Sequence, residues 1–341
     1  MVICVTFNIL LLAAGVVLNG TLLLILVREK SMRTMPNAYI ANLAIADLVL
    51  ITTFLPLFTS DVYTQMWLFG NTLCKIVNFL NVSLFAVSVF TFTALSAERY
   101  YTTRHFLQRA RPGAGASASD GQVTFVVIAV IWTAACALAL PFGLNAREID
   151  DSCVRVKYSE DGDSFTFCVI LIELVALFAV PAALITVFHV LTSREISRSV
   201  ANIPGERAGH RARIRQREKS ALLLLALVLT FLVFNLPYYV HKVWILVYFR
   251  NYDDYTPADT EPWFFFAEIA MCVKHVHACV SPVVLYFMSD SFRKHFNRYL
   301  FCCCCGCCSC CTNKKATEAV SVRHISGTSG TNTQSTLTCL D

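Results

Sequence analysis

Long runs of apolar residues, broken by short polar stretches, follow one another along the chain up to residue 288. Each run reaches the ~20 residues that an α-helix needs to cross the hydrocarbon core of a bilayer. We predict seven membrane-spanning helices, at Val2–Val27, Asn37–Val62, Leu73–Thr103, Gln122–Leu144, Ser164–Leu191, Lys219–Phe249 and Trp263–Met288. Because only short segments separate these runs and no internal repeat is visible, the pattern predicts an all-α membrane protein with one seven-helix bundle, residues 1–288.

The third run has a candidate functional residue or motif at each of its ends. It has no charged residue between Lys75 and Glu98, and as a helix it rises about 38 Å from Cys74 to Arg99 at ~1.5 Å per residue. That length exceeds the ~30 Å hydrocarbon core, so Cys74 and the triplet Glu98-Arg99-Tyr100 reach opposite interfaces. An interfacial arginine is often only a side chain that snorkels toward water. The alternative is a switch, in which Glu98 holds Arg99 and releases it when the helices move.

A different pattern begins after the seventh run. Residues 289–301 alternate polar and apolar positions at helical spacing and are too polar to span, which predicts a short amphipathic eighth helix on the inner membrane surface. The stretch CCCCGCCSCC follows, and its unbroken spacing is unlike that of a metal site. Cysteines beside a membrane favour palmitoylation, which we assign to Cys302, Cys303, Cys304 and Cys305. The segment 302–341 is Cys-rich and then polar, and we expect its polar part to be disordered and phosphorylated.

Composition and charge predict how the chain is oriented across the membrane. With 56% hydrophobic and 15% charged residues among 341, the chain is too apolar for a soluble globule. Basic residues gather at 28–33, 104–111 and 194–219, whereas acidic residues gather at 148–163 and 253–261. The positive-inside rule therefore predicts a multi-pass plasma-membrane protein with an extracellular N-terminus and a cytoplasmic C-terminus. The net charge of +5 reflects this asymmetry and does not indicate a nucleic-acid partner.

The first run lies where a secretory signal peptide would also lie. It lacks a basic leading segment and a small-residue cleavage pattern, and it contains Asn19, so we interpret it as the first spanning helix. Almost no tail precedes it, which leaves open an incomplete N-terminus that upstream genomic sequence would reveal.

Two features of the predicted bundle indicate specific sites: a carboxylate inside a membrane span and a pair of cysteines on one face. Asp47 lies near the middle of the second run, where a carboxylate faces the bundle and usually has a role; it is either a satisfied structural residue or an ion or proton site shared with Ser88. On the oxidising face, Cys74 and Cys153 favour a disulfide between the third helix and the next extracellular loop, which follows the fourth helix. Cys168 is the competing partner, although it falls just inside the fifth run.

The motifs of several other protein classes are missing. The sequence has no HExxH, no GxSxG and no Ser/His/Asp grouping at a motif spacing, so we do not expect an enzyme. Inverted repeats with paired broken helices would indicate a transporter, and none is visible.

The motifs that are present, taken in order, cover nearly the whole chain. They are Asn19, the NLAIADL stretch with Asp47, Cys74, the Glu98-Arg99-Tyr100 triplet, Trp132, Pro181, Pro237 and Ser281-Pro282. In this respect the chain resembles the rhodopsin-like (class A) G-protein-coupled receptors. The stretches SPVVLY, FRKHFNRYLFCC and NIPGE look like the bombesin/gastrin-releasing-peptide receptors and their invertebrate relatives, the CCHamide receptors.

This resemblance implies a receptor for an extracellular, amidated neuropeptide that activates a heterotrimeric G protein of the Gq class and binds arrestin after tail phosphorylation. It implies no cofactor apart from palmitoyl groups and a structural sodium ion held by Asp47 and Ser88. The implied ligand-binding residues are Asn81, Val82, Phe85, Tyr238, Tyr239, Lys242, Met271 and His275. The implied G-protein contacts are Glu98, Arg99, Tyr100 and Leu107.

Several positions depart from the family pattern. Asn235 stands in place of a ligand-sensing Trp, His189 in place of a Tyr in the fifth helix, and Ser281 in place of an Asn. The other departures are His277 beside the sodium site, Phe106 in place of a loop Pro, and Ile245 and Met271 in place of two arginines. A divergent receptor with a different ligand or altered signalling is therefore the alternative.

Two other receptor types fit less well. Asn81 stands where amine receptors carry an Asp, so a protonated amine has no counter-ion there. A light receptor needs a Schiff-base lysine in the seventh helix, and Lys274 is one residue from that place, which turns the side chain by ~100° around a helix.

Overall fold

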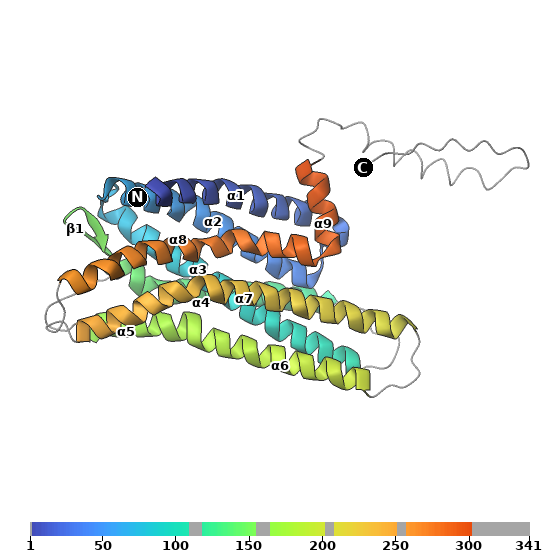
Figure 1. Cartoon of the computed structure of the whole chain (residues 1–341). Helices are drawn as coiled ribbons and strands as arrows, with labels where there is room; N and C mark the ends of the chain where they lie inside the picture. Colours follow the sequence, from blue (N-terminus) through green and yellow to red (C-terminus); the bar gives the residue numbers. More distant parts are fainter. Residues whose placement is uncertain (1, 109–117, 155–163, 202–207, 251–256, 302–341) are drawn as a thin grey trace, which may run out of the picture. The chain divides into compact units, whose positions relative to one another are not determined.

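The computed structural model describes residues 2–108, 118–154, 164–201, 208–250 and 257–301. Its long helices are α1 (Val2–Arg28), α2 (Met35–Thr64), α3 (Gly70–Gln108), α4 (Ala118–Asn145), α5 (Ser164–Leu174), α6 (Val180–Ala201), α7 (Ala208–Arg250) and α8 (Pro257–Met288). The short elements are a 3-10 turn at Lys30–Met32, the strands β1 (Arg147–Ile149) and β2 (Ser152–Val154), helix α9 (Asp290–Phe296) and a π-helical turn at Asn297–Phe301. Figure 1 shows the long helices running side by side.

Seven helical segments in the described part of the chain are long and apolar enough to cross a membrane. One of them is built from α5 and α6, which a π-helical segment at Val175–Ala179 joins. Pro181 follows that segment, and since proline has no N–H to donate, a local widening of the helix accommodates it. The predicted seven-helix bundle with a short helix after the seventh is confirmed.

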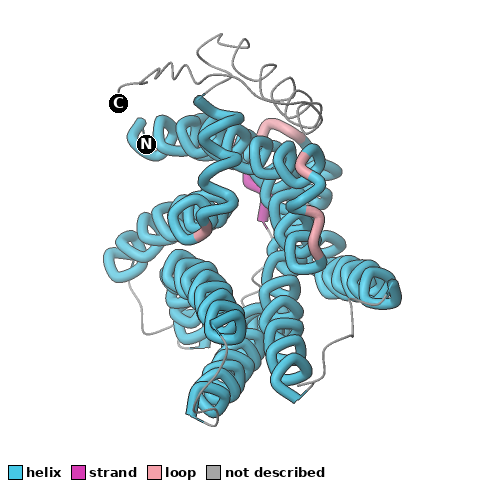
Figure 2. The backbone as a smooth tube through the Cα atoms, turned by 90° about the vertical axis from the view of Figure 1, so that its right-hand side faces the viewer, coloured by secondary structure: helices cyan, strands magenta, loops and turns pink. Residues whose placement is uncertain are grey.

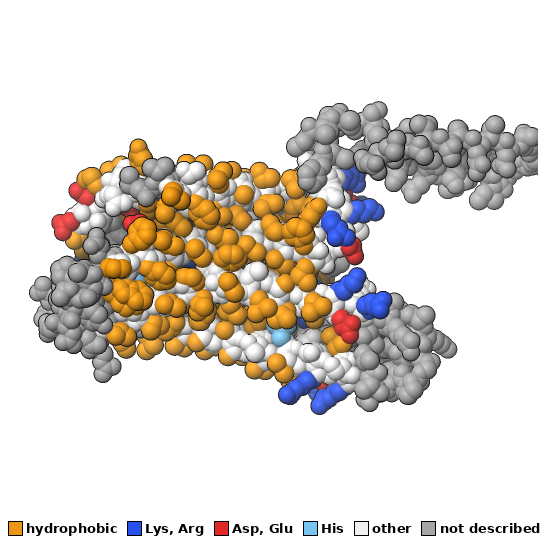
Figure 3. All heavy atoms as spheres, in the orientation of Figure 1, with side chains coloured by type: hydrophobic (Ala, Val, Ile, Leu, Met, Phe, Trp, Pro, Cys, Tyr) orange, Lys and Arg blue, Asp and Glu red, His pale blue; other side chains and the backbone are white. Residues whose placement is uncertain are grey.

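Helix α3 forms the centre of the bundle and packs against α2, α4 and α6. Its residues Leu84, Phe85, Ala86 and Val87 are at most 2% exposed. Figure 2 shows the helices of the bundle end on. The outer faces carry many exposed apolar side chains, which form a broad belt in Figure 3. This belt is what a bundle in contact with lipid requires, because lipid tails cover apolar surface as well as a protein core does.

The two ends of the bundle differ in charge. Acidic side chains gather at the end with β1, which we call the hairpin end, and basic side chains gather at the end with α9, which we call the arginine end (Figures 1 and 3). Helix α9 is amphipathic, since Phe292 and Phe296 are buried while Arg293 and Lys294 are exposed.

The residues Met1–Phe296 form one compact unit. The second unit, Asn297–Asp341, is described only at its first five residues, which form the π-helical turn. Cys302, Cys303, Cys304 and Cys305, the predicted palmitoylation sites, lie outside the described residues.

Candidate functional sites

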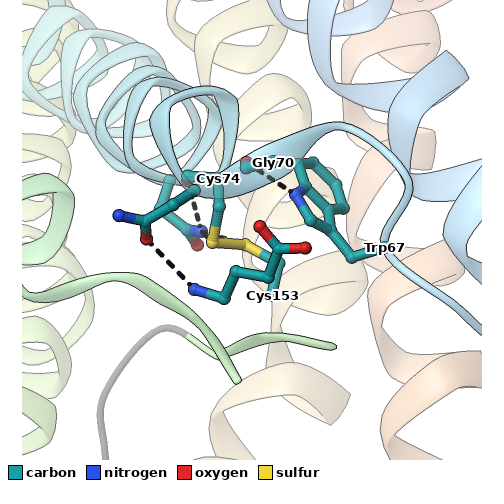
Figure 4. Close-up of a disulfide and its surroundings, with 7 residues drawn as sticks. Trp67, Gly70, Cys74 and Cys153 are labelled. Atoms are coloured by element: carbon teal, nitrogen blue, oxygen red, sulfur yellow. Dashed lines mark hydrogen bonds between the residues drawn. A yellow bond between two sulfur atoms is a disulfide. The ribbon is translucent and has the colours of Figure 1, made fainter. Parts of the chain in front are cut away.

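A disulfide joins the start of α3 to the hairpin. Cys74 and Cys153 are bonded, with their Cα atoms 5.6 Å apart, as Figure 4 shows. Cys168, the competing partner, is free and exposed. The predicted pairing is confirmed, and it fixes the hairpin to the most buried helix of the bundle.

The hairpin itself is shaped by backbone geometry. β1 and β2 pair antiparallel with Glu148 opposite Cys153, and the turn residues Asp150 and Asp151 have φ angles of 47° and 56°, as a tight two-residue hairpin turn requires. The carbonyl of Asp151 accepts a hydrogen bond from the backbone N–H of Trp67 at 2.6 Å. The indole N–H of Trp67 donates in turn to Gly70 at 3.0 Å (Figure 4). The loop before α3 is therefore held against the hairpin.

The predicted ligand-binding residues come from three helices. Asn81, Val82 and Phe85 lie on α3, Tyr238, Tyr239 and Lys242 on α7, and Met271 and His275 on α8. The structure brings part of this set together: the ring of Tyr239 lies 6.4 Å from that of Phe85 and 5.3 Å from that of Tyr238. His275 is placed differently, because its ring stacks on Phe54 of α2 at 4.8 Å. The ligand-binding roles stay predictions.

Sequence reasoning missed Glu173 in this region and considered Lys274 only as a candidate Schiff-base lysine. The Glu173 carboxylate is almost fully buried, accepts a hydrogen bond from the Tyr238 hydroxyl at 2.7 Å and pairs with the Lys242 ammonium at 3.2 Å. The Lys274 ammonium lies over the rings of Phe85 and Tyr238, 4.3 Å and 4.1 Å from their centres. A signal was present, since Glu173 is the only charged residue between Asp163 and Arg194, and a lone carboxylate inside a membrane span marks a functional site.

The aromatic residue that connects this region with Asp47 is Phe231. Its ring lies 5.4 Å from each of the rings of Phe85, Phe92 and His277. Asn235, one turn later on α7, is fully buried and its side-chain amide donates to the carbonyl of Phe231 at 2.7 Å. The side-chain hydrogen bond of Asn235 thus stays within its own helix.

Asp47 and His277 face each other in the middle of the bundle. His277 Nε2 lies 3.9 Å from Asp47 Oδ1, and within the described residues neither atom has a hydrogen-bond partner. His277 Nδ1 contacts the carbonyl of Lys274, and because a carbonyl only accepts, Nδ1 is the donor. The side chain of Ser88 on α3 is a hydrogen-bond partner of Asp47.

These residues can be tested against the implied sodium ion. Sodium is a hard cation, and hard cations take shells of oxygen ligands. Here a carboxylate and a hydroxyl are present, but the third neighbour is the ring nitrogen of His277, 3.9 Å from the carboxylate. The donor set therefore does not fit a sodium ion, because an imidazole that can itself carry a positive charge stands beside the carboxylate.

A cavity of about 240 Å³ opens at the arginine end. Of the predicted triplet, only Arg99 lines it; the other lining residues are Thr102, Thr103, Thr192, Gln216, Arg217, Ser220 and Ala221. The Arg217 guanidinium donates to the carbonyl of Thr102 at 3.0 Å, which joins α7 to α3. The cavity thus lies between α3, α6 and α7 and presents two guanidinium groups.

The other predicted residues at this end lie around the cavity. The Tyr100 hydroxyl accepts a hydrogen bond from Arg104 at 3.1 Å, and its ring lies 6.1 Å from that of Phe188, the neighbour of His189 on α6. Glu98 precedes Arg99 on α3 and is largely buried. The side chain of Leu107 lies outside the described residues.

Comparison with known proteins agrees with the helix pattern. A family model described as "7 transmembrane receptor (rhodopsin family)" matches residues 18–286. The chain is similar to the neuropeptide CCHamide-1 receptor of Drosophila melanogaster, with 36% identity over 301 residues, 86% of this chain and 59% of that receptor. It is also similar to bombesin receptor subtype-3 of Ovis aries, with 30% identity over 86% of this chain and 73% of that receptor. The [Phe13]-bombesin receptor of Bombina orientalis is 30% identical over 88% of this chain and 76% of that receptor.

Proposed function

Because the chain belongs to the seven-transmembrane receptors of the rhodopsin family, we propose that it is a cell-surface receptor that binds a neuropeptide and activates a heterotrimeric G protein. The family consists of receptors and not of enzymes. The observation that carries the proposal is the similarity to the CCHamide-1 receptor, which is named for its neuropeptide and shares 36% identity with 86% of this chain. This chain spans 59% of that receptor's length, so its ligand and partners remain part of the proposal.

The proposed ligand is an amidated peptide that enters from the hairpin end. The acidic side chains at that end attract cationic segments of a peptide, and the disulfide Cys74–Cys153 holds the hairpin where such a peptide would pass. Asn81, in place of an Asp, offers no counter-ion to a small amine. The hairpin end is accordingly extracellular, together with the N-terminus.

The proposed G-protein site is the cavity at the arginine end, on the cytoplasmic side. Arg99 and Arg217 line this cavity, and Thr102 and Thr103 add hydroxyl groups. Guanidinium groups bind carbonyl and carboxylate oxygens of a partner segment strongly. A Gq-class protein is the expected partner, with Glu98, Tyr100 and Leu107 around the cavity.

Residues 302–341 carry the sites that we propose for membrane attachment and for regulation by arrestin. Palmitoyl groups on Cys302, Cys303, Cys304 and Cys305 would tie the chain after α9 to the inner leaflet. Phosphorylated Ser and Thr residues beyond them would recruit arrestin, because each phosphate adds charge and strong acceptor oxygens.

A divergent receptor with altered signalling is the second candidate. The observation in its favour is Asn235, whose side-chain amide bonds to its own helix at the position of the usual sensing Trp. His189 and Ser281 are further departures on α6 and α8.

A peptide panel with a calcium readout tests the proposal. Cells that express the full chain are exposed to CCHamide-1, bombesin and a broad set of other neuropeptides, each in amidated form. A calcium rise to one of them, absent from cells without the receptor, supports the leading proposal. Surface expression without any response across the panel favours the divergent candidate.

A further inference from the structure

Helices α1 and α8 pack against each other, and since they are the first and seventh spans, they run in the same direction. The thiol of Cys279 on α8 donates a hydrogen bond to the carbonyl of Leu11 on α1 at 3.4 Å. A Cβ at Gly15, one turn later on α1, would lie 3.1 Å from the same sulfur. The part of α1 that contains Leu11 and Gly15 therefore faces Cys279 at close range.

A pair of thiols lies about two turns earlier on both helices. Cys4 is seven residues before Leu11, and Cys272 is seven residues before Cys279. Seven residues advance either helix by about 10.5 Å and almost two full turns, so the same register brings Cys4 opposite Cys272. The thiols of Cys4 and Cys272 interact directly, as this register requires.

Cys4 lies on the face of α1 that is buried in the bundle. Asn8, Leu11 and Asn19 mark this face and are 1%, 8% and 0% exposed. Their spacing of roughly one or two turns places them on one side of the helix, and Cys4 is one turn before Asn8 on that side. Cys4 itself is half-buried, because it stands in the first turn of α1, whereas Cys272 is 5% exposed. Cys4 is thus the thiol that a reagent reaches first.

We propose that Cys4 and Cys272 are a redox-sensitive pair that closes into a disulfide between α1 and α8. Both cysteines are free in the structure, which therefore shows the reduced form of the pair. Helix α1 begins at the hairpin end (Figure 1), which we propose to be extracellular, and disulfides form and persist in that environment. The inference takes only this orientation from the proposed function and needs neither a peptide nor a G protein.

The oxidant is a second disulfide, that of oxidised glutathione or of a thiol oxidoreductase. The Cys4 thiol loses its proton, and the thiolate attacks one sulfur of the oxidant, which releases one thiol and leaves a mixed disulfide on Cys4. The thiolate of Cys272 then attacks the Cys4 sulfur and displaces the second thiol. Two protein thiols are thereby oxidised to one disulfide, and the oxidant disulfide is reduced to two thiols.

This bond would act on a different part of the fold from the disulfide already described. Cys74–Cys153 holds the hairpin to α3, whereas Cys4–Cys272 would join the first span to the seventh and close a loop around the bundle. A disulfide that closes a long loop restricts the unfolded chain strongly. The oxidised wild-type receptor should therefore have a higher Tm than Cys4→Ser treated in the same way, and an equal Tm would count against the bond.

Cleavage of the purified full-length receptor between α6 and α7 tests the pair. A specific protease site inserted there separates a half that contains Cys4 from a half that contains Cys272, and Cys74–Cys153 lies within the first half. After exposure to dipyridyl disulfide, a small oxidant, the two halves should stay together on a non-reducing gel. They should separate once a reductant is added.

Cysteine variants assign the link to its two residues. Cys4→Ser and Cys272→Ser should each abolish it, because either change removes one of the two sulfurs. Cys168→Ser and Cys279→Ser, at other free cysteines in the two halves, are the matched controls and should retain it. Wild-type halves that separate without reductant after oxidation, or a link that survives Cys4→Ser, would overturn the inference.

Mass spectrometry of the wild-type receptor decides the same question where a variant fails to fold. A digest of the oxidised protein should contain one linked peptide pair that carries Cys4 and Cys272, and its absence would contradict the proposal. Neither measurement uses a peptide ligand or a G protein. A failed disulfide therefore leaves the proposed receptor function standing, and a silent calcium assay leaves the disulfide test unaffected.

Discussion

His277 Nε2 and Asp47 Oδ1 lie 3.9 Å apart, both buried and both without a hydrogen-bond partner in the described structure. His277 Nδ1 already donates to Lys274, so the Nε2 lone pair faces a carboxylate oxygen unless a proton lies between them. The two atoms are too far apart for a hydrogen bond, and a single proton carried by either side chain makes the pair electrically neutral. The imidazole of His277 thus stands where an added cation would otherwise be needed to balance Asp47.

The first prediction concerns sodium. Replacing NaCl by choline chloride should leave the Tm of the purified wild-type receptor unchanged. His277→Asn exchanges the ring nitrogen for an amide oxygen, and sodium should then stabilise the variant by about 1 kcal/mol or more, or a few degrees in Tm. A sodium-dependent Tm in the wild type itself would contradict this, and His295→Asn on α9 is the matched control.

The second prediction concerns the disulfide. Cys153→Ser should reduce surface expression and lower stability by roughly 2–5 kcal/mol, because the bond closes a loop across a separation of 79 residues. Flow cytometry of intact cells and thermal unfolding measure the two effects. Cys168→Ser, at a free and exposed cysteine, should behave as the wild type. Normal expression of Cys153→Ser would show that the hairpin needs no covalent tie.

The third prediction concerns the cavity at the arginine end. Arg99→Ala should abolish the calcium response, since it removes one of the two guanidinium groups that line the cavity. Peptide binding to intact cells should remain, because Arg99 lies at the opposite end of the bundle from the proposed ligand site. Arg198→Ala is the control, as its side chain is 72% exposed and it forms an ion pair with Glu195 on the same helix. A full calcium response from Arg99→Ala would exclude this cavity as the coupling site.

The fourth prediction concerns helix packing. A Cβ at Gly143 of α4 would lie 2.7 Å from the Cβ of Phe79 and 3.2 Å from the carbonyl oxygen of Lys75, both on α3. Gly143→Ala should therefore destabilise the receptor by about 1–3 kcal/mol, the usual cost of overpacking. At Gly20 of α1 a Cβ meets nothing within 4 Å, so Gly20→Ala should be neutral or slightly stabilising. Thermal unfolding of the two variants side by side measures the difference, and equal stability would refute the close contact.

The lengths of the apolar runs predicted the seven-helix bundle, because few structures other than membrane-spanning helices require uninterrupted apolar runs of ~20 residues. The helices extend beyond their predicted ends, as α3 does from Thr103 to Gln108, because polar residues outside the apolar core can continue a helix. The cysteine pairing was predictable from the face on which Cys74 and Cys153 lie.

Side-chain partners were harder to predict than helices. The ring of His275 stacks on Phe54 of α2, and Glu173 pairs with Lys242 across two helices. Such contacts depend on the rotation of each helix about its axis, and packing between helices decides that rotation, which an apolar run leaves open. The one signal in the sequence for these contacts was Glu173, a single charged residue within an apolar run.

The position of Phe231 has an energetic consequence. Its ring contacts those of Phe85, a proposed ligand residue, and His277, beside Asp47, each at 5.4 Å between centres. Aromatic pairs of this kind contribute ~0.5–1.5 kcal/mol each beyond their buried area, so separating both would cost ~1–3 kcal/mol. Coupling free energies between distant sites in allosteric proteins are typically of that same size, ~1–3 kcal/mol. The two contacts of this one phenylalanine are therefore as large in energy as a typical coupling between two sites.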